Sequence, residues 1–124
     1  KQRQLVTVLL ALFTRGTVEF YDSYHLDPSE GITIMTVLSD SNPRNVRESA
    51  VEFILRDSTG KVYRDSDLFF YASPVNERTI MGITLYDVTY EIYAAGDFRE
   101  VEQIDLFVMV DGLLGRTEHT WFLQ

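Results

Sequence analysis

The sequence predicts an all-β fold, a two-sheet β-sandwich of about seven or eight short strands in one domain that spans residues 1–124. Three observations favour it. Apolar and polar residues alternate with the period of two that a half-buried strand requires. Clusters of turn-forming residues separate these runs at spacings of roughly 8 to 15 residues, as in sandwiches and small barrels. No repeat, low-complexity tract or linker divides the chain.

The clearest strand lies at residues 86–93. Its apolar face consists of every second residue, namely Tyr86, Val88, Tyr90 and Ile92. The residues between them are polar, so we expect one face to pack on a core and the other to meet solvent. The same reasoning predicts strands at 32–38, 104–110 and 119–123.

A hairpin is predicted at residues 51–64. Val51, Phe53 and Leu55 alternate with Glu52 and Arg56, and the run DSTG follows at 57–60. Asp, Ser and Thr bond their own backbone in turns, and Gly60 can adopt a positive φ. The strand should therefore reverse here and continue into residues 61–64.

Two segments depart from this pattern. Asp97, with Glu100 three residues later, has the spacing of a helix N-cap, which predicts one short helical turn near 97–102.

Residues 5–13 satisfy both strand and helix periodicity, and their Val and Thr content favours a strand. This segment also resembles the start of a signal peptide, but no small-x-small cleavage site follows. It is shorter than the roughly 20 residues that cross a bilayer, so no membrane insertion is expected.

Residues 53–63, FILRDSTGKVY, resemble the Phe-x-Leu-x-Asp-x-x-Gly-x-x-Tyr pattern of bacterial immunoglobulin-like domains of the telokin-like, immunoprotection type. The resemblance covers this hairpin and the preceding strand at 32–38. It implies an immunoglobulin-like sandwich, an extracytoplasmic location and the absence of an active site. The sequence departs from the family at 40–45, where the family has an Asn-rich turn, and lacks the Cys…Trp…Cys pattern of antibody domains.

Charge and cysteine content exclude several classes of function. The chain has 11 Lys and Arg against 19 Asp and Glu, a net charge of −8, and no basic stripe. Nucleic acid is therefore not an expected partner. The absence of cysteine excludes disulfides, thiolate metal sites and thiol nucleophiles. The absence of cysteine leaves the compartment open. The resemblance implies an extracytoplasmic or secreted location, with the cytoplasm or a virion as the alternative.

No metal site and no cofactor are predicted. His25 and His119 lie in unrelated segments and are interpreted as a loop residue and a strand residue. The weak calcium candidates are Asp65 and Asp67, which could converge with acidic loop residues at one end of a sandwich. Those residues are Asp22, Asp27 and Glu30. Their spacing matches no EF-hand loop, and solvated turn acids explain them equally well.

No catalytic site is predicted either. Ser23, His25 and Asp27 supply the residue types of a hydrolase triad, but no Gly-x-Ser-x-Gly elbow accompanies them. Without a motif that activates a nucleophile, we expect a protein that is not an enzyme.

The aromatic run Leu68, Phe69, Phe70 and Tyr71 is the most informative candidate site. A strand with four consecutive apolar residues cannot point all of them inward. Either both of its faces are buried in the domain, or one face is a contact surface.

Three functions follow from these observations. The first is a non-enzymatic binding domain of a bacterial extracytoplasmic protein that contacts a protein or glycan through loops or a sheet edge. The second is a structural subunit of a phage or surface assembly, a homo-oligomer in which residues 68–71 are buried between copies. The third is a small-ligand carrier or hydrolase with a barrel interior, which requires an internal pocket with convergent polar groups.

Overall fold

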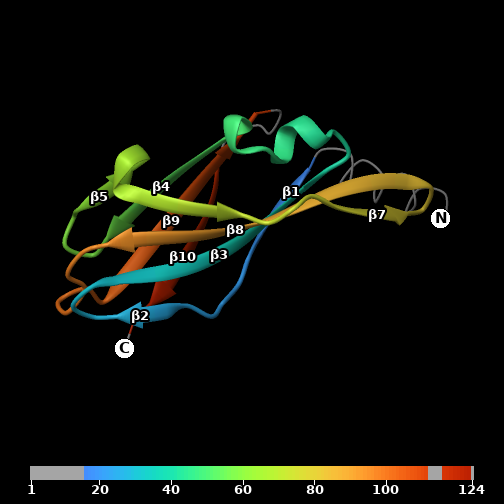
Figure 1. Ribbon diagram of the computed structural model, residues 1–124. Helices are drawn as coiled ribbons and strands as arrows, with labels where there is room; N and C mark the ends of the chain where they lie inside the picture. The colour runs from blue at the N-terminus through green and yellow to red at the C-terminus, as the bar shows by residue number, and fades with distance from the viewer. Residues whose placement is uncertain (1–15, 112–115, 124) are drawn as a thin grey trace.

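The computed structural model describes residues 16–111 and 116–123 and arranges their strands in two antiparallel sheets (Figure 1). In the larger sheet, β1 and β2 pair with one side of β3, β8 pairs with the other side, and β6 and β7 pair with the far side of β8. The smaller sheet has the order β10-β9-β4-β5. The predicted all-β, two-sheet sandwich is therefore confirmed. The strands are β1 (Thr17–Phe20), β2 (His25–Asp27), β3 (Gly31–Asp40), β4 (Val51–Asp57), β5 (Val62–Arg64), β6 (Leu68–Ala72), β7 (Asn76–Ile80), β8 (Ile83–Ala95), β9 (Gln103–Val110) and β10 (Thr117–Phe122).

β3 and β8 form the spine of the larger sheet. Their ladder runs from Gly31 opposite Ala95 to Asp40 opposite Tyr86. β8 has 13 residues and extends past both ends of the predicted strand at 86–93. Its first half pairs with β7 and its second half with β6. Figure 1 shows β6, β8, β3 and β2 side by side in this order.

The core lies between the two sheets and uses the alternation seen in the sequence. Val88, Tyr90 and Ile92 of β8 face Phe53 and Leu55 of β4 within one buried cluster. Each fully buried Leu, Ile or Phe side chain contributes roughly 1.5 to 3 kcal/mol. Within the described residues, every buried side-chain nitrogen or oxygen has a hydrogen-bond partner. The other buried members of the cluster are Ile32, Ile34, Leu38, Val46, Tyr63, Leu68, Ala94, Phe98, Val101, Ile104, Leu106, Val108, Val110 and Trp121.

The hairpin of β4 and β5 forms where the sequence predicts it. The buried Asp57 side chain accepts hydrogen bonds from the Thr59 hydroxyl at 2.6 Å and from the backbone N–H groups of Thr59 and Lys61 at 2.9 and 3.1 Å. Its second oxygen accepts from the Tyr63 hydroxyl at 3.3 Å. Gly60 adopts the positive φ that the turn requires, 94°. One carboxylate therefore organises the whole connection.

The predicted helical turn near 97–102 is a non-helical turn. The Val101 N–H donates to the Phe98 carbonyl three residues earlier, and the Asp97 side chain accepts from the Arg99 N–H. The next N–H, that of Glu102, donates to the Ser58 hydroxyl at 2.9 Å. Because this donor is taken by another loop, the turn does not continue as a helix.

Short 3-10 helices occur elsewhere, at η1 (Pro43–Val46), η2 (Glu48–Ala50) and η3 (Asp65–Asp67). The structure has ten strands in its described part instead of the seven or eight predicted, because several short ones pair at the edges.

His25, interpreted as a loop residue, begins β2 opposite Thr33, whereas His119 lies in β10 as predicted. The segment 5–13 lies outside the described residues. No helix in the described part combines the length and hydropathy needed to cross a bilayer.

Candidate functional site

β6, the strand that carries the aromatic run, lies at an edge of the larger sheet. It pairs with β8 and with no other strand of the described residues. η3 precedes it and brings the chain across from β5 in the smaller sheet. No strand of the described residues pairs with the other side of β6, which we call the β6 edge.

The structure divides the side chains of the aromatic run between two faces. Leu68 is buried in the core, and Phe70 points the same way, with its ring 5.1 Å from that of Phe53 and 39% of its surface exposed. Phe69 and Tyr71 lie on the outer face, where they are 61% and 66% exposed. The interpretation that both faces are buried is therefore wrong for Phe69 and Tyr71. Their role as interface residues stays a prediction.

The register of β6 and β8 determines which backbone groups the edge offers. The Ser73 N–H donates to the Thr89 carbonyl at 2.9 Å, so this pair is hydrogen-bonded across the ladder. Hydrogen-bonded and non-hydrogen-bonded pairs alternate along antiparallel strands. Phe69 and Tyr71 therefore direct their N–H and C=O groups toward β8. Those of Leu68, Phe70 and Ala72 point away from β8, toward the free edge.

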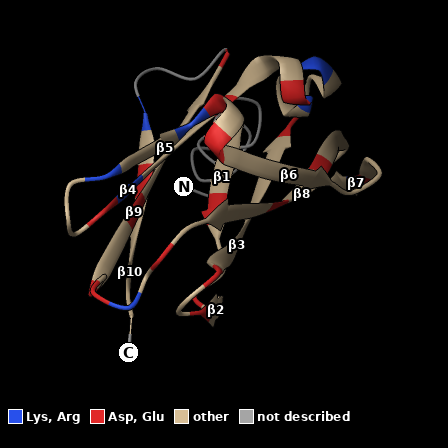
Figure 2. Cartoon of the chain, turned by 60° about the vertical axis from the view of Figure 1, so that its left-hand side comes forward, with Lys and Arg blue, Asp and Glu red and all other residues tan. Residues whose placement is uncertain are grey.

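The β6 edge also differs from the other sheet edges in charge. Among the described strands, β1, β2, β5, β7 and β10 also lie at edges, and each carries Asp, Glu, Arg or His. β6 carries none, and the uncharged run continues from Leu68 to Asn76. In Figure 2 its ribbon is free of charge colouring, in contrast to the acidic η3 before it. Charged residues on edge strands prevent unwanted pairing, so an uncharged aromatic edge favours it.

A groove continues from the C-terminal end of β6. It has a volume of about 480 Å³ and lies between β6, β8 and the two short helices η1 and η2. We call it the β6 groove. Val75 is 49% exposed beside it, and the Tyr90 hydroxyl donates to the Val46 carbonyl at 2.5 Å in its wall. Its lining residues are Val46, Arg47, Glu48, Ser49, Ala72, Ser73, Val75, Val88 and Tyr90.

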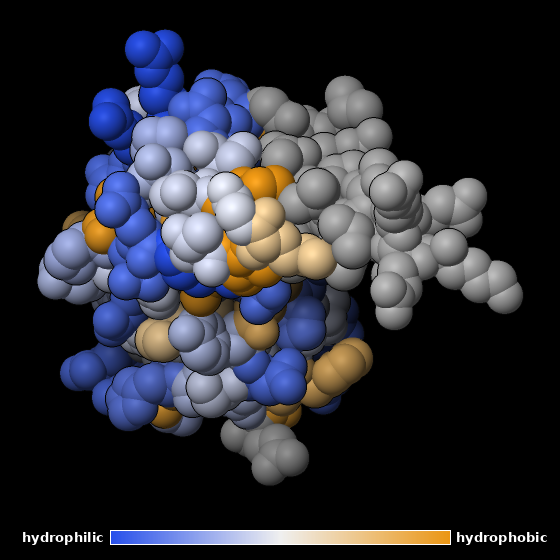
Figure 3. Space-filling model, turned by 90° about the vertical axis from the view of Figure 1, so that its right-hand side faces the viewer, coloured by the Kyte–Doolittle hydropathy of each residue, from blue (hydrophilic) through white to orange (hydrophobic). Residues whose placement is uncertain are grey.

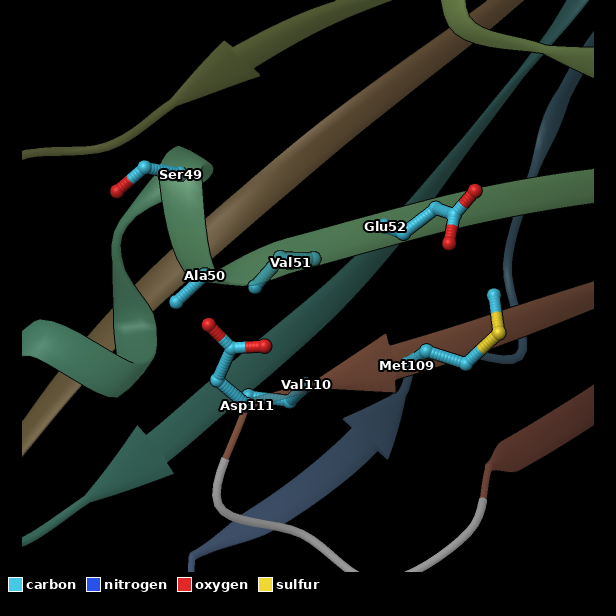
Figure 4. Close-up of a pocket in the computed structure, with 7 residues that line it drawn as sticks. All are labelled: Ser49, Ala50, Val51, Glu52, Met109, Val110 and Asp111. Carbon is cyan, nitrogen blue, oxygen red and sulfur yellow. The ribbon is translucent and has the colours of Figure 1, made fainter.

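A second depression lies where β4 begins and β9 ends, with a volume of about 330 Å³. Its polar groups belong to Ser49, Glu52 and Asp111. In Figure 4 the Ser49 hydroxyl and the Glu52 carboxylate point to opposite sides, and neither approaches the other. Polar groups that diverge in this way do not form the convergent set that a catalytic or ligand pocket requires.

The residue types of a triad do not form one. Ser23 and His25 line a shallow cavity of about 250 Å³ on the outer face of β2 and β3. No hydrogen bond joins them to each other or to Asp27 within the described residues, and Asp27 accepts instead from the Ser29 hydroxyl at 3.3 Å. The nucleophile and base of a hydrolase need that bond.

The calcium candidates do not converge either. Asp67 accepts from the Arg64 N–H at 3.2 Å and caps η3, next to Asp65. Asp22 lies 3.6 Å from the His119 imidazole. Across the described residues, no group of three His, Asp or Glu side chains is placed to hold a metal ion.

Burial shifts the pKa of two tyrosines. It raises the pKa of Tyr90, in the wall of the β6 groove, to about 12, and the negative charge of Glu48 adds to the effect. Burial also raises the pKa of Tyr63 to about 12, with a further contribution from the Asp57 carboxylate. Both hydroxyls are therefore neutral hydrogen-bond donors at physiological pH.

No protein-family model, no curated protein and no solved structure matches this chain. The resemblance of residues 53–63 to telokin-like domains stays a prediction, as does the location that it implies.

Sequence reasoning found the aromatic run but missed the β6 groove. The groove joins residues from η1, η2, β6, the β6–β7 connection and β8, and no local pattern links these segments. The uncharged run at 68–76 is the one indication in the sequence that could have extended the candidate site beyond Tyr71.

Proposed function

We propose that this protein is a non-enzymatic interaction module that binds an extended peptide segment of a protein partner by strand addition to the β6 edge. The observation that carries the proposal is that β6, among the described edge strands, is aromatic and has no charged residue, whereas each of the others carries Asp, Glu, Arg or His. One side of β6 is paired with no described strand. In strand addition, backbone hydrogen bonds supply affinity and side-chain pockets supply specificity.

Three features of the site support this mode of binding. The backbone groups of Leu68, Phe70 and Ala72 point toward the open edge and can pair with an added strand. The exposed rings of Phe69 and Tyr71 offer apolar contacts on the outer face. The β6 groove lies at the end of the same strand and can accept side chains on the inner face.

A peptide fits this surface better than a glycan does. Glycan recognition depends on convergent polar side chains beside aromatic rings, whereas the outward groups of the β6 edge are backbone donors and acceptors in a regular row. An extracytoplasmic location remains part of the proposal, on the resemblance of residues 53–63.

The test is selection of a random peptide library on the wild-type protein, followed by binding to the Ala72→Pro variant. The Ala72 N–H points to the free edge, so proline removes that donor and leaves the ladder with β8 intact. We expect the selected peptides to bind this variant at least about tenfold more weakly.

The matched control is Ala72→Val, which adds similar bulk and keeps the N–H. Peptides selected on the wild type should bind this variant more tightly than they bind Ala72→Pro, and any loss relative to the wild type measures the effect of the bulk added to the β6 groove. Peptides that bind both variants and the wild type equally, or a library that yields no binders while a glycan array does, would contradict the proposal.

A further inference from the structure

We infer that the segment added to the β6 edge is the same strand of a second copy, in an antiparallel β6 pair whose two-fold axis passes beside Phe70. The inference rests on the proposed use of the β6 edge. It identifies the partner as another molecule of this protein and joins two larger sheets into one continuous sheet.

The hydrogen-bonding pattern of β6 is self-complementary in this register. The outward-pointing groups belong to Leu68, Phe70 and Ala72, and Phe70 is the middle residue of the three. An axis beside Phe70 places Leu68 opposite Ala72 of the second copy and Phe70 opposite its own counterpart. Outward residues then meet only outward residues, as hydrogen-bonded pairs of an antiparallel ladder must.

The side chains on the outer face match in the same register. Phe69 comes to lie opposite Tyr71 of the second copy, and the symmetry repeats this pair. These are non-hydrogen-bonded positions, at which facing side chains approach most closely and aromatic pairs stabilise a sheet. Tyr93 already lies beside Phe69, with ring centroids 6.3 Å apart, and extends the aromatic layer. In the dimer, Phe69 and Tyr71 of each copy, which are exposed in the monomer, would thus be covered by the same two residues of the other copy.

Charges near the strand fit this arrangement. The register places Asp67 opposite Ser73 of the second copy and Asp65 opposite Val75, so no acid faces an acid. Ser73 lines the β6 groove together with Arg47 and Glu48. Arg47 is exposed and forms no ion pair with the described residues, so it can meet the incoming Asp67. The Glu48 carboxylate lies in the same wall and would repel Asp67.

The absence of cysteine from the chain permits a direct test of the register. Phe69→Cys and Tyr71→Cys are prepared separately, then mixed and oxidised. In the proposed register residues 69 and 71 of different copies face each other with Cα atoms about 4.5 Å apart. Residue 69 and its own counterpart lie on a diagonal, beyond the roughly 7 Å limit for a disulfide.

We expect the mixture to give at least about fivefold more disulfide-linked dimer than either variant alone. Light scattering of the wild type should give a mass near twice the 14.3 kDa of one chain at high protein concentration. Ala72→Pro should lower the dimer fraction more than Ala72→Val does, because only proline removes the N–H that points to the edge. Circular dichroism and thermal unfolding establish that each variant is folded.

Two results would overturn the inference. A wild-type monomer at concentrations up to about 1 mM, with no preferential cross-link in the mixture, excludes the second copy as the partner. A dimer that persists in Ala72→Pro, or cross-links equally in all samples, places the interface elsewhere. In either case the peptide selection still decides separately whether the β6 edge binds a different protein.

Discussion

Asp57 illustrates how a single polar side chain can determine a connection between strands. Its carboxylate is buried yet accepts from Thr59, Lys61 and Tyr63, so each of its two oxygens has a donor. A buried acid is stable only with such partners. The Asp, Gly and Tyr of the 53–63 pattern thus have a structural explanation that needs no ligand.

Replacement of Asp57 should therefore be costly. Asp57→Ala leaves two turn N–H groups and the Tyr63 hydroxyl without an acceptor, and we expect a loss of about 2 to 4 kcal/mol in the free energy of unfolding. Urea denaturation measures this loss. Asp22→Ala, whose side chain is 99% exposed, is the control and should change stability little. Equal effects of the two substitutions would refute this account of the hairpin.

The buried tyrosines predict a loss of stability at high pH. Tyr63 and Tyr90 have pKa values of about 12 in the folded protein against about 10 in the unfolded chain. The unfolded chain therefore loses these protons first, and stability declines as pH rises from about 10 toward 12. The difference between the two pKa values corresponds to a decline of at most about 3 kcal/mol for each tyrosine.

Urea denaturation between about pH 8 and 11 covers the onset of this decline. Tyr90→Phe removes the ionisable hydroxyl and should make the profile flatter than that of the wild type. A variant profile that remains as steep would show that other groups control alkaline stability.

At the scale of elements, the pattern of the sequence predicts those strands that contribute to the core. β4, β8 and β9 were found because alternate residues in them pack between the sheets. β7 was missed because four of its five residues are exposed and none of them alternates with a buried one. It is a strand because β8 offers it a pairing edge, which is a tertiary effect.

The same distinction explains the partial success at the candidate site. Phe69 and Tyr71 were recognised as residues that a strand could not bury on one face. Their position at an edge depends on strand order, and the β6 groove depends on η1 and η2 packing beside β8. Neither arrangement leaves a local pattern in the chain.

The turn between β7 and β8 predicts a stabilising substitution. Met81 and Gly82 have φ values of 53° and 80°, the pair of positive angles found in two-residue type I′ hairpins. Methionine is unfavourable there, whereas Asn-Gly is the preferred sequence. Met81→Asn should stabilise the protein by roughly 0.5 to 1 kcal/mol, and the branched Met81→Ile should destabilise it.

Thermal unfolding ranks the wild type, Met81→Asn and Met81→Ile. Hydrogen exchange at Arg78 and Ile80, whose N–H groups point toward β8 in the ladder, localises the effect to the hairpin. The opposite order of stability, or changes in exchange spread over both sheets, would contradict this account of the turn.

At the scale of the whole molecule, the chain is strongly acidic, whereas β6 carries no charged residue. The view in Figure 3 is mainly hydrophilic, with apolar areas restricted to small patches. A net charge of −8 keeps the molecules apart in general, so association depends on a specific surface. The arrangement favours ordered pairing over aggregation.

The balance between electrostatic repulsion and association through the β6 edge should change near the isoelectric point. The sequence has a pI of about 4.6, at which the repulsion between molecules disappears. We expect turbidity of the wild type to reach a maximum near this pH and to be reduced more in Ala72→Pro than in Ala72→Val. Turbidity that is identical in all three proteins would mean that the β6 edge plays no part in association.

The two ladders on β8 also determine how the molecule responds to mechanical force. β8 is joined to β3 from Gly31 to Asp40, but to β6 only from Leu68 to Ala72. A load applied through a partner bound at β6 passes to the rest of the domain across the shorter ladder. β6 should therefore shear away from β8 first, while β3 and β8 stay paired, so the domain would lengthen at this edge before its longest ladder separates.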